Sequence, residues 1–241
     1  MSKGRLIATI TVVVVAFTGL VIFSQTNKAP VDYGQYRISN IKTLADRQFD
    51  YELNPDKIYE ASEDTGGLPE KVIGDPSKAK VVLYEYADYA CAHCAEWSRS
   101  LDLMVEKSNG DLAVVYRGYL LPGFKNNLVA ASAATAAQIQ GCWKEYKDLL
   151  YADQSEWTSL SGSALEDKLI TCFQEASGGK GDIEQFKSDM KSEAVAKKIA
   201  FEYRLGKETD LKGTPSFRID GQNIEIKDLR ETVDKKLTSA A

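Results

Sequence analysis

Two cysteines and the chain's single histidine share the run Cys91-Ala92-His93-Cys94. The thiols are about one helical turn apart on one face of a helix, so their sulfurs can close a small disulfide ring. At a helix N-terminus the backbone amides would favour thiolate over thiol at Cys91, and an imidazolium at His93 would add positive charge nearby. The run therefore predicts a redox pair that switches between dithiol and disulfide.

Half of a zinc site is the alternative interpretation of such a pair. Structural zinc takes four ligands, usually from two such pairs. The remaining cysteines, Cys142 and Cys172, are far apart, and neither has a cysteine or histidine neighbour. The ligand count therefore disfavours zinc, and we expect neither a metal nor a cofactor.

Length and charge restrict the function further. A chain of 241 residues with ordinary apolar content is long enough for one catalytic domain plus accessory segments. The net charge is −5, and lysines and glutamates are interspersed along the sequence. Phosphate binding needs a clustered basic face, so we expect no nucleic-acid partner.

The N-terminus predicts the compartment. Lys3 and Arg5 precede an uncharged run, residues 6–23, of about 18 residues or roughly 27 Å as a helix, close to the thickness of a hydrocarbon core. The run lacks a clear small-x-small cleavage site, which favours an uncleaved signal anchor over a cleaved signal peptide. Basic residues stay on the cytoplasmic side. The chain is thus expected to be a single-pass protein of the cell membrane with its catalytic domain outside the cytoplasm.

The thiol pair lies between predicted elements of a β-α-β unit. The run 80–86 is rich in β-branched and aromatic residues, as a buried strand should be. Residues 94–107 have helical spacing, and 112–116 predict a second strand.

The rest of the chain predicts five segments. Helical composition fills the centre, and a hairpin at 216–226 precedes a C-terminal helix at 228–237. The α/β fold then divides into a transmembrane helix (1–24), a polar extracytoplasmic tether with at most a short packed helix (25–67), the first part of the core (68–125), a helical insertion (126–207) and the second part of the core (208–241).

Four motifs together carry a family resemblance. They are Gly74-Asp75-Pro76, Leu83-Tyr84-Glu85-Tyr86-Ala87-Asp88-Tyr89, Cys91-x-His93-Cys94 and Gly213-Thr214-Pro215-Ser216-Phe217. Over roughly residues 70–240 the chain resembles the DsbA family of extracytoplasmic thiol:disulfide oxidoreductases. The resemblance implies a thioredoxin fold that carries a helical insertion.

The resemblance also implies roles for the motif residues. Cys91 would be the exposed nucleophilic sulfur and Cys94 its buried partner. His93 would adjust the pKa of Cys91; the alternative is that His93 is only an exposed polar residue at the helix start. Thr214 and Pro215 would form a threonine and cis-proline loop that faces the thiols and binds extended substrate. The chain has Ala92 where the family prototype has proline, so the redox potential of the prototype cannot be assigned to this chain.

Glu85 has two interpretations. It matches a buried acidic residue of the prototype's first core strand, where it could relay the proton of the buried cysteine. A surface carboxylate on the strand is the equal alternative, because a buried unpaired carboxyl is costly.

Cys142 and Cys172 both fall in the predicted insertion. An oxidising compartment and an even cysteine count favour a structural disulfide, worth roughly 3 to 4 kcal/mol for a loop of about 30 residues. Two free buried thiols are the alternative.

The predicted function is a membrane-tethered oxidase that donates its Cys91–Cys94 disulfide to reduced cysteine pairs of exported proteins in the bacterial cell envelope. A membrane reoxidant, DsbB-like or VKOR-like, would recharge it. The alternatives are a reductase or isomerase of the same fold, and a redox-inactive peptide-binding or chaperone module.

Overall fold

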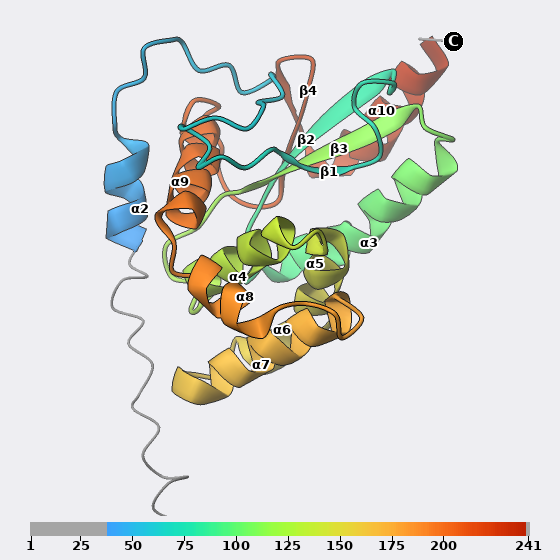
Figure 1. Cartoon of the computed structure of the whole chain (residues 1–241). Helices are drawn as coiled ribbons and strands as arrows, with labels where there is room; N and C mark the ends of the chain where they lie inside the picture. Colours follow the sequence, from blue (N-terminus) through green and yellow to red (C-terminus); the bar gives the residue numbers. More distant parts are fainter. Residues whose placement is uncertain (1–37, 240–241) are drawn as a thin grey trace, which may run out of the picture. The chain divides into compact units, whose positions relative to one another are not determined.

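A five-stranded sheet with the order β1-β3-β2-β4-β5 forms the centre of the computed structural model, which describes residues 38–239 (Figure 1). Strands β2 (Val81–Ala87) and β3 (Leu112–Gly118) pair in parallel and are joined by helix α3 (Ala92–Lys107). Strand β4 (Ser216–Ile219) runs antiparallel to β2 and forms a hairpin with β5 (Gln222–Ile224). The predicted β-α-β unit and hairpin are confirmed.

Burial explains why the central strands read as continuous apolar runs. All seven residues of β3 are buried, as are six of the seven in β2. Strand β1 (Lys71–Ile73), which pairs antiparallel with β3, was not predicted. It has three residues and begins with a lysine, so it carries no alternating pattern to detect.

The segment between β3 and β4 is helical, as predicted. Alanine-rich α4 is buried along most of its length, and its small side chains let neighbouring helices approach closely. In Figure 1, α4 to α8 gather below the sheet. The helices of the segment are α4 (Asn127–Ile139), α5 (Trp143–Ala152), α6 (Gln154–Trp157), α7 (Gly162–Ala176), α8 (Ile183–Asp189) and α9 (Glu193–Lys207). A 3-10 turn, η1 (Ile226–Asp228), and helix α10 (Leu229–Ser239) end the described chain.

The segment before the sheet contains the short packed helix that the predicted tether allowed, and residues beyond this helix are packed as well. Helix α2 (Ile38–Ala45) lies beside α9 and buries Ile41 and Ala45 (Figure 1). Tyr59 is buried edge-on against Phe201 with ring centroids 4.9 Å apart. Aromatic residues scattered without a period thus pack against a partner far along the chain, which composition alone does not reveal.

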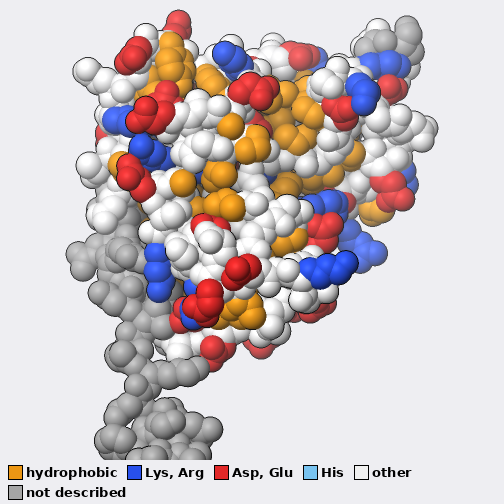
Figure 2. Space-filling view, in the orientation of Figure 1, with side chains coloured by type: hydrophobic (Ala, Val, Ile, Leu, Met, Phe, Trp, Pro, Cys, Tyr) orange, Lys and Arg blue, Asp and Glu red, His pale blue; other side chains and the backbone are white. Residues whose placement is uncertain are grey.

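The predicted transmembrane helix, residues 1–24, lies outside the described residues. Within residues 38–239, no helix combines the length and the apolar character needed to cross a membrane. On the face drawn in Figure 2, acidic and basic side chains are interspersed.

Five buried charged residues connect α9 to the edge of the sheet. Glu202 forms an ion pair with Lys71 and accepts a hydrogen bond from the backbone N–H of Gly118 at 2.8 Å. Arg117 binds Glu70 at 2.7 Å, and Lys198 lies 3.4 Å from Glu70 and 3.6 Å from Glu202. This network fixes α9 against β1 and β3, and so sets where the chain leaves the helical segment to form β4. Its members are Glu70, Lys71, Arg117, Lys198 and Glu202.

Replacing Glu202 should test the network. Glu202→Gln can still accept the Gly118 hydrogen bond but leaves Lys71 buried without its anionic partner, so we expect the free energy of unfolding to fall by about 3 to 5 kcal/mol. Urea unfolding measures it. Glu208→Gln, which removes the partly exposed ion pair with Arg204, should cost less than about 1 kcal/mol. Equal effects of the two variants would contradict a stabilising role for the buried charges.

Candidate active site

The two thiols stand at the first turn of α3. Cys91 is the N-cap residue, with extended backbone, and its carbonyl accepts hydrogen bonds from the backbone N–H of Cys94 at 3.1 Å and of Ala95 at 3.2 Å. Cys94 lies inside the helix and is fully buried. The helix start therefore brings both sulfurs to the same turn, at the end where backbone N–H groups are unpaired.

The surroundings shift the pKa values of the two thiols in opposite directions. A hydrogen bond from Cys94 is the largest cause that lowers the pKa of Cys91 to about 5; bonds from Thr214 and from the backbone N–H groups of Cys94 and His93 act in the same direction. Burial raises the pKa of Cys94, and so do its hydrogen bond to Cys91 and the charge of Glu85. Cys91 is thus a thiolate near neutral pH while Cys94 keeps its proton.

The predicted exposure of Cys91 needs correction. The residue is only 4% exposed. As a thiol, its Sγ donates to the backbone carbonyl of Thr214 at 3.2 Å, so the loop before β4 packs directly against it. The Thr214–Pro215 bond is cis, as the family resemblance implied. The Thr214 hydroxyl is buried and has no hydrogen-bond partner in residues 38–239, which leaves it available to the thiolate.

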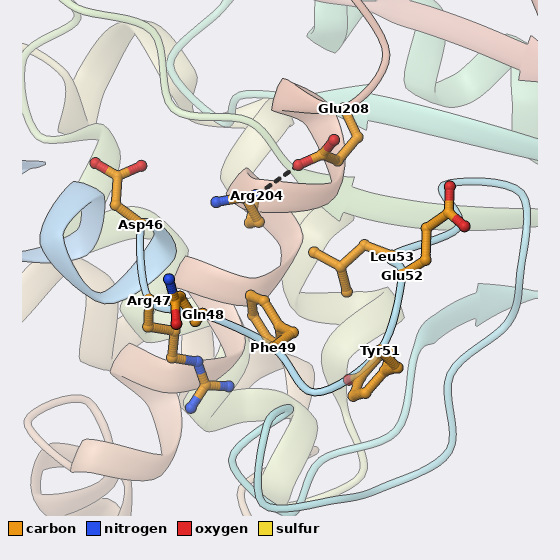
Figure 3. Close-up of a pocket in the computed structure, with 9 residues that line it drawn as sticks. All are labelled: Asp46, Arg47, Gln48, Phe49, Tyr51, Glu52, Leu53, Arg204 and Glu208. Atoms are coloured by element: carbon orange, nitrogen blue, oxygen red, sulfur yellow. Dashed lines mark hydrogen bonds and ion pairs between the residues drawn. The ribbon is translucent and has the colours of Figure 1, made fainter.

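A cavity extends from this loop. It has a volume of about 460 Å³ and is lined by residues 210–217 and 223–226. Thr214 and Pro215 both line it, and Thr214 also contacts Cys91. A second cavity, of about 510 Å³, is drawn in Figure 3 and is formed by residues 46–53 (except Asp50) with Arg204 and Glu208. No predicted site residue lines this second cavity, and its Arg204 and Glu208 pair with each other (Figure 3).

His93 projects into solvent. Its side chain is 76% exposed, and Nδ1 lies 3.0 Å from Oε2 of Glu96. The hydrogen bond with Glu96 raises the pKa of His93, and the charges of Glu96 and Cys91 add to the effect. Because the imidazolium is exposed, solvent screens its influence on Cys91; the backbone N–H at this position acts on the sulfur directly.

Glu85 is buried on β2, so it is not the surface carboxylate that the sequence left as the alternative. It is 2% exposed, and one carboxylate oxygen has no hydrogen-bond partner among the described residues. Burial raises the pKa of Glu85 to about 8; the charge of Lys147 opposes that shift, and Asp102 reinforces it. A buried carboxyl that holds its proton near neutral pH therefore belongs to the groups whose charge acts on Cys94.

Two residues that sequence reasoning missed hold the loop before α3. Asp88 is fully buried and accepts hydrogen bonds from the backbone N–H of Ala90 (2.9 Å) and Leu121 (3.0 Å) and from Asn127 Nδ2 (2.8 Å). Burial raises the pKa of Asp88 to about 6. Gln154 Nε2 donates to the carbonyls of Tyr89 (2.7 Å) and Cys91 (3.0 Å). Asp88 lies in a motif already singled out, whereas Gln154, 63 residues from Cys91, has no sequence signal.

The structure corrects the predicted disulfide between Cys142 and Cys172, since both are free buried thiols. Cys142 is the N-cap of α5, and its Sγ contacts the Ala137 carbonyl at 3.6 Å. Cys172 Sγ lies 3.9 Å from Oδ2 of Asp153, the C-cap of α5. A helix of that length separates its caps by about 16 Å, so the two sulfurs lie toward opposite ends of α5 and cannot bond.

Comparisons with known proteins agree with the geometry. A family model described as thioredoxin matches residues 68–236. The Na(+)/H(+) antiporter NhaA of Herminiimonas arsenicoxydans is 29% identical over 154 residues, which is 63% of this chain and 22% of the antiporter. The chain thus spans about a fifth of the length of these first relatives. The probable disulfide bond formation protein D of Bacillus cereus is 24% identical over 200 residues, 78% of this chain and 88% of that protein.

Solved structures show the same fold. A thioredoxin-like oxidoreductase from Silicibacter pomeroyi has a TM-score of 0.55 at 26% identity, over 72% of this chain and 95% of its own. Oxidised BdbD from Bacillus subtilis has a TM-score of 0.58 at 19% identity, over 77% of this chain and 100% of its own.

The ionisation of Cys91 gives a pH prediction. Ultraviolet absorbance of the thiolate in the reduced chain should titrate with a midpoint near pH 5. Because folding lowers this pKa from the ordinary value of about 8.5, the thiolate's contribution to the stability of the reduced form is complete above that value and is lost as pH falls through about 5. Cys91→Ser should abolish the transition. A midpoint near the ordinary thiol value would show that the site does not stabilise the thiolate.

Gln154→Ala should loosen the loop that carries Cys91. Two carbonyls lose their donor, so we expect amide hydrogen exchange within residues 89–95 to accelerate by about tenfold or more. Gln140→Ala serves as the control, because Gln140 donates to the carbonyl of Asp182 elsewhere in the same helical segment. If the two variants exchange alike in the loop, Gln154 does not hold it.

Proposed function

The chain belongs to the thioredoxin family, and from this premise we propose that it is a protein thiol:disulfide oxidoreductase of the DsbA and BdbD type that works as a dithiol oxidase. One observation carries the proposal: the environment of the pair stabilises a thiolate at Cys91 and a thiol at Cys94. A stabilised thiolate favours the reduced form, so the disulfide is a strong oxidant that readily passes to another protein.

The steps follow from this difference between the sulfurs. A substrate thiolate attacks Sγ of Cys91 in the disulfide; the Cys91–Cys94 bond breaks, and Cys94 leaves with the electron pair. A second substrate thiolate then attacks the substrate sulfur of the mixed disulfide, and Cys91 leaves as the thiolate that its surroundings favour. The substrate has lost two electrons and gained a disulfide, and the enzyme holds both electrons as its reduced pair.

Buried Glu85 supplies the proton for this exchange. When Cys94 leaves as a thiolate, the protonated Glu85 carboxyl can give up its proton, and the carboxylate can take the proton back when the enzyme is reoxidised. Thr214 and Pro215 would bind extended substrate beside Cys91, with the adjoining cavity along the chain's path.

The setting of the reaction also belongs to this proposal. The substrates would be reduced cysteine-containing proteins exported from the cytoplasm, with an anchor in residues 1–24 that holds the catalytic domain at the outer face of the cell membrane. A DsbB-like or VKOR-like membrane protein would accept the two electrons and restore the disulfide.

The equilibrium redox potential of the full chain tests the direction. Titration against glutathione should give a value near the strongly oxidising end, about −120 mV, and the oxidised chain should convert a two-cysteine peptide to its disulfide. Cys91→Ser is the inactive control. A potential of about −230 mV or below, with reduction of the peptide disulfide favoured, would move the protein to the reductases.

A further inference from the structure

Lys147 is a buried cation that the steps above do not use. It lies on α5 and is 1% exposed, and its ammonium donates to Oγ of Ser98 at 2.7 Å. It forms ion pairs with Asp102 at 3.3 Å and with Asp148 at 2.7 Å. Burying an ammonium is costly in free energy, and these three partners offset part of that cost.

The groups that Lys147 binds lie on the redox helix. Cys94, Ser98 and Asp102 follow one another at intervals of four along α3, which places them on one face. Cys94 and Ser98 are buried, whereas the Asp102 side chain is 20% exposed. The ammonium therefore binds the same face of α3 that carries Cys94, between the buried end and the solvent-accessible end.

The charge of Lys147 also acts on Glu85, which is buried on β2, together with charges from neighbouring elements. Strand β4 places uncharged Phe217 opposite Glu85. Within residues 38–239, Lys147 is the cation that acts on this carboxyl. The titratable groups whose charge interacts with Glu85 are Cys94 and Asp102 on α3, Lys147 and Tyr151 on α5, Tyr89 in the loop before α3, and Tyr116 on β3.

We propose that Lys147 is a positioning residue for disulfide exchange: its fixed charge stabilises the Glu85 carboxylate that forms when Cys94 takes a proton. The proposal rests on the oxidoreductase function. One proton moves from the Glu85 carboxyl to the Cys94 thiolate as that sulfur leaves the disulfide, and it returns when the Cys94 sulfur attacks the mixed disulfide. The helical segment thus contributes to the chemistry of the core through α5.

A direct titration of Glu85 tests the electrostatic claim without relying on any redox activity. Carboxyl carbon NMR of the labelled, reduced full chain should show the pKa of Glu85 rising by about one unit or more in Lys147→Met, while Lys147→Arg keeps it near the wild-type value. Should Lys147→Met fail to fold, Lys147→Gln, which can still hydrogen-bond Ser98, removes the same charge.

Lys144 provides a matched control. It lies on the same helix and binds the same acids, Asp102 at 3.2 Å and Asp148 at 2.9 Å, but its side chain is 43% exposed. Lys144→Met should leave the pKa of Glu85 nearly unchanged. Equal shifts in Lys144→Met and Lys147→Met, or none in either, would overturn the proposal and leave the oxidoreductase assignment intact.

The second readout is the rate at which Cys94 attacks a mixed disulfide between Cys91 and glutathione. Lys147→Met should move the pH midpoint of this rate upward by the same amount as the Glu85 titration and slow it about tenfold at neutral pH. In a Glu85→Gln background the further change Lys147→Met should have no effect on the midpoint. An unchanged midpoint in Lys147→Met overturns the proposal; failure of the wild-type chain to exchange disulfides at all would overturn the function instead, and the NMR titration would still decide the role of Lys147.

Discussion

The start of α3, which holds both thiols within one helical turn, is the constraint on which the rest of the site depends. There the interaction with Cys94 is the largest cause that lowers the pKa of Cys91, whereas burial is the largest cause that raises the pKa of Cys94. This difference requires Cys91 just outside the helix and Cys94 inside it. The loop that ends at Cys91 must therefore be held in one conformation, and buried polar groups hold it: Asp88 through its backbone partners, and Gln154 through two carbonyls.

The helical segment between β3 and β4 participates in the site. Gln154 comes from α6, Lys147 from α5, and Trp143, at the start of α5, donates its indole N–H to the hydroxyl of Tyr89 at 2.9 Å. Tyr89 in turn stacks on Tyr116 of β3 with centroids 5.2 Å apart. At the far end of the segment, the buried ion pairs of Glu202 fix α9 to the sheet. The helical segment thus gives the thioredoxin core two groups: Gln154, which holds the active-site loop, and Lys147, which binds the face of α3 that carries Cys94.

Local pattern predicted the elements that position the thiols, because β2 and β3 are short buried runs of β-branched and aromatic residues and α3 has helical spacing. The cis bond before Pro215 followed from the family resemblance and not from the residues, since X-Pro bonds are usually trans. Pairings across long separations could not be predicted: nothing near Gln154 or Lys147 points to α3. The Cys142–Cys172 bridge was predicted from cysteine count and compartment, neither of which locates the cysteines relative to the two ends of α5. The short packed helix that the tether allowed is present as α2, but polar composition gave no indication that Tyr59 contacts Phe201.

Two titrations affect different steps of disulfide exchange at this site. Cys91 is charged, and so able to attack or to leave, above its pKa of about 5. In the proposed relay, the Glu85 carboxyl gives a proton to Cys94 below its pKa of about 8, and the carboxylate accepts the proton of Cys94 above that value. A pH below this pKa therefore favours the step in which Cys94 leaves the disulfide, and a pH above it favours the step in which Cys94 attacks the mixed disulfide. The first pKa is set by hydrogen bonds at the start of α3, and the second by burial of a carboxyl on β2.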